Sequence, residues 1–209
     1  MYVNTGLKNL ANCLLRHGVQ ALRWRGLVSG RIEPHRFRLY KAELLEKFSG
    51  DAGRVLDIGC GYRRYERFCR GSEYIGLDKD LSFRPTVQSV GEKLPFRDSC
   101  IDTVIMFDVV EHLSDVKEAL RECVRVLRKG GSLVITTPNT WGFGFYDSFA
   151  DRTHRHHFSW ASLEKRLRES GLVVEKRIPL HLHIFWPLRR IHSKLLMPLQ
   201  QSICVVARR

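Results

Sequence analysis

The sequence lacks closely paired cysteines. Six cysteines occur among 209 residues, with no C-x-x-C pair and no spacing typical of a secreted disulfide framework. Cys60 lies in a glycine-bounded turn and Cys123 on the apolar face of an expected helix, where a disulfide is difficult to form. Because cysteines stay reduced in the cytoplasm, we expect a cytoplasmic protein with free thiols.

Long apolar runs are also absent. Lys8 and Arg16 interrupt the N-terminal apolar stretches, so we expect no signal peptide. The longest uncharged segments near the C-terminus, 178–188 and 195–207, are too short to span a bilayer and contain prolines. These absences predict a soluble chain that at most lies on a membrane surface.

Acidic residues are scarce. The chain has 22 Asp and Glu against 35 Lys and Arg, a formal net charge of +13, and no acid follows Arg177. Such an excess is typical of proteins that meet nucleic acid, an anionic membrane or an acidic small molecule, but a solvated basic surface has the same composition. No basic block of five residues is present, so charge alone does not select a partner.

The most informative segment is RVLDIGCGY, residues 54–62. It predicts a short buried strand that enters a turn bounded by Gly59 and Gly61. Glycine permits a tight turn and a close approach to a ligand, and the following helix directs its amide-rich N-terminus at that ligand. A second strand, 74–77, ends in Asp78, where an acid binds ribose hydroxyls in dinucleotide-type folds. Together these segments predict a nucleoside-binding α/β sheet.

A third glycine is missing from this turn. NAD-binding folds need it because the following helix packs beneath a pyrophosphate, but Arg64 occupies that position and the segment 63–65 is bulky. A ligand with a ribose and no pyrophosphate fits better. S-adenosylmethionine, an adenosine joined to methionine by a sulfonium, is such a ligand.

Hydrophobic patterning extends the alternation of strands and helices along the chain. The further elements that we expect are a short helix at 63–69, a strand at 102–107, a helix from Ser114 or Asp115 to Gly130, a strand at 132–137, a helix at 159–170, a strand at 172–177 and an antiparallel strand at 202–207. This order is typical of a sheet with helices on both faces.

Three segments lie outside this alternation. Residues 1–50 are expected to form a basic helical cap over the ligand cleft or the sheet edge, with a lipid-binding amphipathic anchor as the alternative. The connection 138–158 is rich in aromatic residues and histidines, which favours a functional loop over disorder. The apolar and basic insertion 178–201 fits a lid, a homodimer face or a membrane contact. Residues 51–209 are expected to form one domain that is compact together with the cap.

Six motifs follow one another in the order DIGCG, GLD, LPF, FDVVEHL, LRKGGSLVITTPN and THRHHFS. This series covers roughly residues 35 to 175 and resembles the class I S-adenosylmethionine-dependent methyltransferases of the small-molecule, type 11 kind. The resemblance implies a Rossmann-like, doubly wound, mostly parallel seven-stranded sheet with an antiparallel C-terminal strand, preceded by N-terminal helices. It also implies that 51–209 is the methyltransferase domain and that S-adenosylmethionine is its cofactor.

The expected cofactor residues lie where three strands end. They are Asp57, Gly59, Cys60, Gly61, Asp78, Lys79, Gly91, Glu92, Phe107 and Asp108. Asp57 and the glycine turn are assigned to the methionine end and Asp78 to the ribose. An aspartate that usually contacts the adenine amino group in the resembled family is replaced by Val90, so backbone near Gly91 is expected to bind the ring edge.

The catalytic residues are predicted from the reaction. Methyl transfer from a sulfonium is an in-line displacement, so positioning the two reactants supplies most of the catalysis. A hydroxyl acceptor also needs a base, for which His112 and His154 are candidates, with Asp108 beside them. A purely structural role for such a histidine is the alternative. We expect no metal; the alternative is a divalent ion on Asp108, Glu111 and His112, as some resembled quinone-type O-methyltransferases have.

The predicted function is methyl transfer to a small or lipid-like acceptor at oxygen or nitrogen. An anionic membrane surface and a second copy of the chain are further expected partners. One alternative is an RNA methyltransferase that uses the basic surface, although the motif FDVV lacks the N/D-P-P-Y pattern of amino-directed nucleic-acid methylation. The other is an inactive methyltransferase-like binding protein, since Arg63 and Val90 depart from the family pattern.

Overall fold

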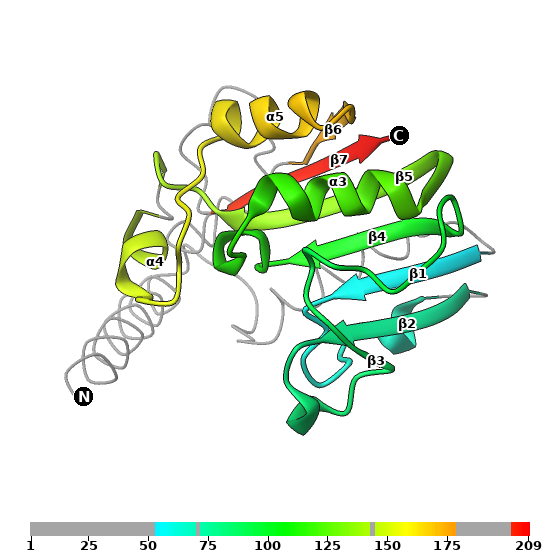
Figure 1. The fold of residues 1–209 in the computed structure, drawn as a ribbon. Helices are drawn as coiled ribbons and strands as arrows, with labels where there is room; N and C mark the ends of the chain where they lie inside the picture. The colour runs from blue at the N-terminus through cyan, green and yellow to red at the C-terminus, as the bar shows by residue number, and fades with distance from the viewer. Residues whose placement is uncertain (1–52, 70–71, 143–144, 179–201) are drawn as a thin grey trace, which may run out of the picture.

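A computed structural model describes residues 53–69, 72–142, 145–178 and 202–209. In these residues the chain forms one seven-stranded sheet with the order β3-β2-β1-β4-β5-β7-β6 (Figure 1). The described strands pair in parallel except β7, which is antiparallel to both β5 and β6. The Rossmann-like, mostly parallel sheet with an antiparallel C-terminal strand is thereby confirmed.

The elements follow the sequence pattern closely. The strands are β1 (Gly53–Ile58), β2 (Ser72–Asp78), β3 (Val87–Gln88), β4 (Ile101–Phe107), β5 (Leu127–Pro138), β6 (Val173–Arg177) and β7 (Ser202–Arg208). The α-helices described are α3 (Val116–Val126), α4 (Phe145–Ala150) and α5 (Trp160–Glu169), and the 3₁₀ helices are η1 (Glu66–Phe68), η2 (Leu81–Phe83) and η3 (Val110–His112). The predicted cap 1–50 and residues 179–201 of the insertion lie outside the described residues.

The helix starts confirm the capping signals in the sequence. The Asp115 carboxylate accepts a hydrogen bond from the Glu118 amide at 3.0 Å and begins α3. Ser159 and Ser162 exchange side-chain and backbone hydrogen bonds as a capping box at the start of α5. None of the helices within the described ranges is long and apolar enough to cross a membrane.

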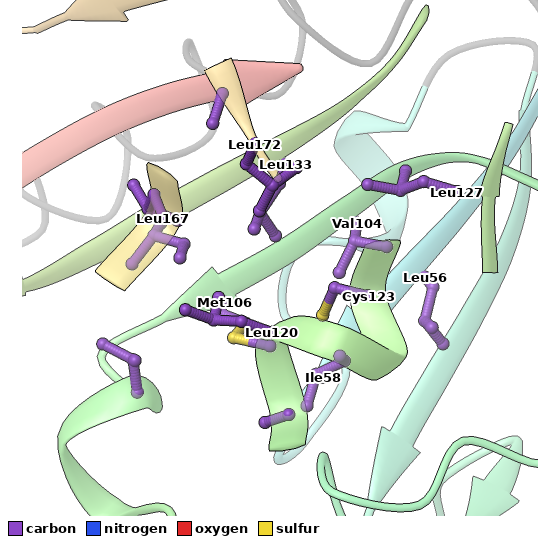
Figure 2. Close-up of a cluster of buried hydrophobic side chains, with 14 of the residues drawn as sticks. Leu56, Ile58, Val104, Met106, Leu120, Cys123, Leu127, Leu133, Leu167 and Leu172 are labelled. Carbon is purple, nitrogen blue, oxygen red and sulfur yellow. The ribbon is translucent and has the colours of Figure 1, made fainter. Parts of the chain in front are cut away.

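The core fills both faces of the sheet because alternate residues of each central strand point to opposite sides. On one face, α3 turns Leu120 and Cys123 toward Leu56 and Met106 of the sheet (Figure 2). A second cluster lies on the other face and contains Val55, Ile105, Phe107, Val134, Cys204 and Val206. The strands buried on both faces form a rigid platform, and the site lies at their carboxyl ends.

Two helix boundaries differ from the prediction. We expected α3 to continue to Gly130, but it ends at Val126 and β5 begins at Leu127. The cause is a tertiary contact. Leu127 is fully buried and pairs with Ile101 of β4, so it belongs to the sheet and does not extend the helix. Gly130, with φ of 79°, instead lies within the long β5 strand, where the pairing register with β4 shifts between Leu127 and Ser132.

The second difference is the expected helix at 63–69. In the described residues between Gly61 and Cys69 the chain forms turns and only the three-residue η1. Arg63 has φ of 54°, a left-handed conformation that cannot belong to an α-helix. The glycine turn is therefore not followed by a regular helix whose N-terminus points at the ligand.

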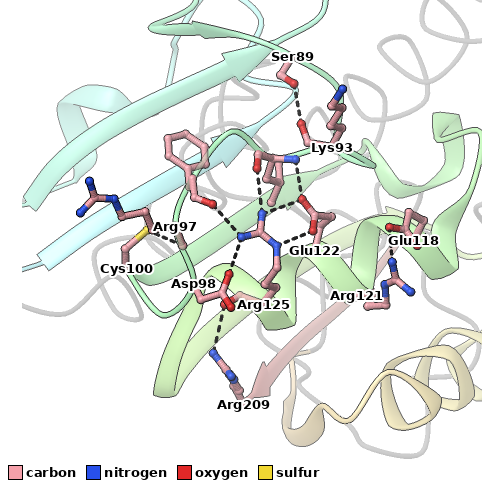
Figure 3. A network of polar contacts seen from close by, with 12 residues as sticks. Ser89, Lys93, Arg97, Asp98, Cys100, Glu118, Arg121, Glu122, Arg125 and Arg209 are labelled. Carbon is pink, nitrogen blue, oxygen red and sulfur yellow. Dashed lines mark hydrogen bonds and ion pairs between the residues drawn. The ribbon is translucent and has the colours of Figure 1, made fainter.

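A polar network fastens the segment before β4 to α3 (Figure 3). The Arg125 guanidinium donates to the carbonyls of Phe96 and Leu94 and to the carboxylates of Asp98 and Glu122 over 2.6–2.9 Å. With this many acceptors in place, Arg125 holds the 94–98 segment in a fixed position beneath the sheet.

Candidate active site

The site lies where the sheet order reverses, at the carboxyl ends of β1, β2 and β4. Doubly wound sheets bind ligands at such a switch point. β1 pairs with both β2 and β4, so Asp57, Asp78 and Phe107 reach the same edge of the sheet. Asp57 and Asp78 are 2% and 8% exposed, and each is therefore a carboxylate largely removed from water.

The glycine turn presses against the residues that follow β4. Gly59 has φ of 70° and Gly61 φ of 48°, which favour glycine. A side-chain carbon at Gly59 would lie 2.5 Å from Cγ2 of Val109, whereas one at Gly61 would meet nothing within 4 Å in the part of the chain that the structure describes. The first glycine therefore allows close packing, and the second leaves open space beside the turn for a ligand.

Asp78 fixes the turn from the end of β2. Its Oδ2 accepts a hydrogen bond from the Gly61 amide and its Oδ1 from the Asp80 amide, both at 3.0 Å. A carboxylate oxygen has more than one acceptor position, so each oxygen can still receive a ribose hydroxyl. The neighbouring Lys79 is exposed, and its backbone carbonyl accepts from the side-chain Nε2 of Gln88 at 3.2 Å. The arrangement at Asp78 fits the predicted ribose contact.

Asp57 lies beneath the turn and is linked to Tyr74, a residue that the sequence interpretation missed. The Tyr74 hydroxyl donates to Oδ2 of Asp57 at 2.5 Å. Burial raises the pKa of Asp57 to about 7, the Tyr74 hydrogen bond opposes this rise, and Asp78 adds to it. The Asp57 carboxyl is therefore about half ionised near pH 7, and the ammonium group of a bound methionine moiety would favour its ionised form.

The signal for Tyr74 lies in the strand register. Asp57 pairs with Gly76, and Val55 pairs with Tyr74. The Tyr74 side chain therefore lies on the same face of the sheet as Asp57, two residues before Gly76 along β2. A side-chain carbon at Gly76 would lie 2.9 Å from the Cys60 sulfur and 3.3 Å from the Tyr74 ring. The glycine of the GLD motif therefore leaves the space that Cys60 and Tyr74 fill.

The predicted residues Cys60, Gly91 and Glu92 have structural contacts. Burial raises the pKa of the Cys60 thiol to about 12, so it stays protonated. A side chain at Gly91 would come within 3.1 Å of Leu113. Glu92 accepts hydrogen bonds from the Ser114 and Asp115 amides at 2.7 and 3.2 Å and thus attaches the predicted adenine loop to the start of α3.

The other half of the site follows β4. Asp108 has φ of 56°, and its Oδ1 accepts a hydrogen bond from the Thr136 hydroxyl at 2.9 Å. Glu111 is 1% exposed, and its Oε2 accepts from the Thr137 hydroxyl at 2.9 Å. Two successive threonines of β5 thus orient the two acids of the FDVVEHL motif.

The structure brings His112 and His154 together, although they lie far apart in the sequence. Their ring centroids are 4.6 Å apart. Nδ1 of His112 lies 3.2 Å from the Thr153 carbonyl, and Nδ1 of His154 lies 2.9 Å from the Ser148 carbonyl. Because a carbonyl only accepts, a proton on Nδ1 satisfies both contacts and leaves Nε2 of His112 as a base or ligand, while Nε2 of His154 lies 3.8 Å from Oδ2 of Asp151.

Backbone contacts hold the histidine-rich segment against the end of β4. The Glu111 carbonyl accepts from the Arg155 and His156 amides at 2.8 and 3.1 Å. His156 Nε2 lies 3.0 Å from the Leu113 carbonyl, and Arg155 donates to the Ser114 hydroxyl at 2.7 Å. Residues of the THRHHFS segment are therefore hydrogen-bonded to the residues that follow FDVV in the chain.

The ionisation of His112 depends on several neighbours. Burial lowers the pKa of His112, and the charge of His154 acts in the same direction. The Thr153 carbonyl and the carboxylates of Asp151 and Asp108 oppose this shift. Because burial is the largest of these causes, His112 is neutral near pH 7 and competent as a base.

A cluster of three potential metal ligands differs from the alternative set in the sequence analysis. Donor atoms of Glu111, His112 and His154 lie within 4.8 Å of one another. Asp108 is outside this group, and His154 takes its place. One carboxylate and two imidazoles form a donor set that divalent transition metals accept.

Exposed aromatic side chains accompany the histidines in the connection after β5. Trp141, Phe145 and Phe149 are 81%, 60% and 49% exposed. Phe149 stacks on His157 with ring centroids 4.1 Å apart, and its ring lies 4.8 Å from that of Phe145. Apolar rings exposed in the same loop as His154 favour contact with an apolar molecule.

Comparison with known proteins places this geometry in a family. A family model described as a methyltransferase domain matches residues 32–177. A protein of Mycolicibacterium smegmatis named "Probable S-adenosylmethionine-dependent methyltransferase" is 37% identical over 138 residues, 59% of this chain and 54% of that protein. The mitochondrial ubiquinone biosynthesis O-methyltransferase of Rattus norvegicus is 33% identical over 111 residues, 47% of this chain and 32% of that protein.

The fold comparison agrees with the sequence comparison. A crystal structure of a SAM-dependent methyltransferase from Archaeoglobus fulgidus has a TM-score of 0.61 at 22% identity, covering 84% of this chain and 97% of the other. The chain spans about half the length of the curated relatives it matches. The chain belongs to the class I S-adenosylmethionine-dependent methyltransferase family.

Proposed function

We propose that this chain transfers the methyl group of S-adenosylmethionine to a hydroxyl oxygen of a small, largely apolar acceptor. The observation that carries the proposal is the pair His112 and His154, fixed through Nδ1 at the carboxyl edge of the sheet. The exposed rings of Trp141 and Phe149 favour an apolar acceptor over a highly charged one. A relative whose name includes ubiquinone biosynthesis and O-methyltransferase adds support.

The chemistry follows from the positions of these groups. The bound cofactor supplies an electrophilic methyl carbon on a sulfonium. Asp57 would hold its ammonium group and Asp78 its ribose, and the acceptor oxygen would approach from the side of the histidines. Nε2 of His112 would accept the proton of the acceptor hydroxyl as the oxygen–carbon bond forms and the carbon–sulfur bond breaks, with S-adenosylhomocysteine as the other product. The His154 ring lies against the His112 ring and holds it in place.

Methyl transfer to a panel of small molecules tests this proposal. Purified protein and labelled S-adenosylmethionine are incubated with matched pairs of apolar phenols and amines, and the products are resolved by mass. We expect methylation of the phenols. We also expect the rate to fall as the pH drops below the pKa of His112, which is lower than the ordinary pKa of histidine, because protonated His112 cannot accept a proton. Methylation of amines alone would contradict the assignment of oxygen.

The Glu111–His112–His154 cluster favours a second candidate, in which a divalent metal binds these residues and polarises the acceptor hydroxyl. Treatment with a chelator distinguishes the two. The base mechanism predicts an unchanged rate after dialysis against EDTA. A loss that Mn²⁺, Mg²⁺ or Zn²⁺ restores would assign the cluster to metal binding.

The remaining partners rest on composition. RNA and anionic membranes are proposed from the net charge of +13, and membrane and homodimer contacts were predicted for segments outside the described residues. Affinity for RNA that falls steeply with salt would support the RNA alternative. Co-sedimentation with anionic but not neutral vesicles would support the membrane.

A further inference from the structure

Arg63 has a backbone conformation that does not suit its side chain. It stands two residues after Gly61 in the cofactor turn and has φ of 54°. Glycine adopts this conformation without strain, whereas an arginine there is strained. Because strained residues concentrate at functional sites, the side chain at this position calls for a function.

The cofactor presents a charge that the turn does not yet neutralise. The methionine end of S-adenosylmethionine carries an ammonium and a carboxylate. Asp57 suits the ammonium, but the carboxylate needs a cation or a helix N-terminus. Between Gly61 and Cys69 the described chain offers only the three-residue η1. Within this turn a positive side chain is the group that could bind the carboxylate in place of a helix N-terminus.

The Arg63 guanidinium lies beside the methionine end of the site. Its Cζ is 5.7 Å from the centroid of the Tyr74 ring, and the hydroxyl of that ring binds Asp57. Its charge also acts on the Cys60 thiol between the two glycines of the turn, lowering a pKa that burial raises. The positive group therefore lies next to the ammonium partner rather than out in solvent.

The guanidinium also has donor capacity left over. Nη2 donates to Glu66 Oε1 at 2.7 Å, and the side chain is 31% exposed. Nε is buried and has no hydrogen-bond partner among the described residues. An arginine has five N–H donors, so a carboxylate arriving at this edge would find donors directed from one rigid plane.

We propose that Arg63 binds the carboxylate of the methionine moiety of S-adenosylmethionine, and that Glu66 holds the guanidinium in place beforehand. Two neighbouring side chains then bind the two charged groups of the methionine moiety: Asp57 binds the ammonium and Arg63 binds the carboxylate. The proposal concerns the cofactor and is independent of which acceptor is methylated.

Calorimetric titration with three ligands tests it. S-adenosylhomocysteine has both charged groups, its decarboxylated analogue lacks only the carboxylate, and methylthioadenosine lacks the whole amino-acid end. We expect Arg63→Met to weaken S-adenosylhomocysteine about 10- to 100-fold, the effect of losing hydrogen bonds to a charged group, and to leave the other two ligands unchanged. Arg64→Met is the matched control and should change none of the three.

Equal weakening of all three ligands would show that Arg63 only shapes the turn, and no weakening of any would show that it does not contact the cofactor. Either result overturns the proposal. Arg63→Gly gives an independent check, because it removes both the strain and the side chain. We expect a higher melting temperature together with weaker binding of S-adenosylhomocysteine, whereas a structural arginine would lower the melting temperature when replaced.

Glu66→Gln completes the set. Removing its charge loosens the guanidinium, so binding of S-adenosylhomocysteine should be weaker than in the parent protein but stronger than in Arg63→Met. Unchanged or tighter binding in this variant would contradict the assignment of Glu66 as a holding group. Because these measurements are of binding and melting temperature and none is of methyl transfer, failure of this proposal is distinguishable from failure of the proposed methyl transfer to a hydroxyl.

Discussion

The two edges of the sheet use charge in opposite ways. At the edge where the parallel strands begin, arginines meet acids directly: Arg54 contacts Glu73 at 2.7 Å and Arg128 contacts Asp102 at 2.7 Å. At the edge where they end, buried Asp57 accepts from a tyrosine hydroxyl and Asp78 from backbone amides. Charge is neutralised within the protein at the first edge and is available to a charged ligand at the second.

This comparison predicts that substitutions at the two edges separate function from stability. Variants at the carboxyl edge should alter binding or catalysis with little loss of stability, whereas variants at the amino edge should do the reverse. The predictions below run from the largest expected effect to the smallest.

The largest effect is expected for the base. His112→Gln should lower the rate of methyl transfer by about 100- to 10,000-fold, because a glutamine cannot accept the hydroxyl proton. Affinity for S-adenosylhomocysteine and the melting temperature should stay within error. His157→Gln, a histidine of the same loop that stacks on Phe149, is the control and should retain activity. A rate that survives in His112→Gln would remove the base assignment.

Asp78→Ala should abolish the thermal shift that S-adenosylhomocysteine gives, with an affinity loss of about 100-fold, because the ribose loses a charged acceptor and the Gly61 amide its partner. Asp80→Ala removes an exposed carboxylate only two residues away and should keep the shift. If both variants still respond to the ligand, the nucleoside does not bind where β2 ends.

The ionisation of Asp57 should make the stability of the fold depend on pH. Its pKa of about 7 in the folded protein lies above the ordinary pKa of 3.8 for an aspartate, so burial favours the protonated form and the fold loses stability as the pH rises from 3.8 to 7. Asp57→Asn should raise the free energy of unfolding at pH 8 by up to about 4 kcal/mol, at about 1.36 kcal/mol for each pKa unit, and by little at pH 4. Urea titrations at the two pH values measure this difference.

The same carboxyl group should make cofactor affinity depend on pH. Ionised Asp57 attracts the ammonium group of the cofactor, so affinity should rise between pH 6 and pH 8 in the parent protein. Asp57→Asn should bind more weakly and show no such rise. A parallel pH dependence in both proteins would assign the titration to another group.

The smallest effects belong to the amino edge. Arg125→Met leaves the largely shielded Glu122 carboxylate and the carbonyl of Leu94 without their donor, and should lower the free energy of unfolding by about 1–3 kcal/mol. Arg54→Met breaks a pair whose side chains are 47% and 60% exposed, and should lower the free energy of unfolding less than Arg125→Met does. Both variants should bind S-adenosylhomocysteine like the parent. Weakened binding in Arg54→Met would show that the two edges are coupled.

The sequence was sufficient to predict the strands, turns and helix starts that depend on residues close together in the chain. Strand 74–77 and the glycine turn were found because their apolar residues and glycines lie together along the chain. The convergence of His112 with His154 was anticipated because both segments leave neighbouring parallel strands at the same edge. The starts of α3 and α5 were found because Asp115 and Ser159 cap them through residues three positions ahead.

What failed depends on contacts distant in sequence. The end of α3 was placed too late because pairing of Leu127 with Ile101 outweighs helix propensity. Tyr74 escaped notice because its role appears only in the register between β1 and β2. The helix expected at 63–69 is missing because Arg63 adopts a left-handed conformation, which no periodicity reveals.

The position of β7 between β5 and β6 has a consequence for biosynthesis. On the ribosome, β6 leaves the exit tunnel before β7 and has no described partner in the sheet until that strand arrives. Meanwhile the long β5 presents an unpaired flank that favours contact with other nascent chains. Closure of the sheet therefore awaits translation of residues 202–208, and a premature stop before them would leave an aggregation-prone product.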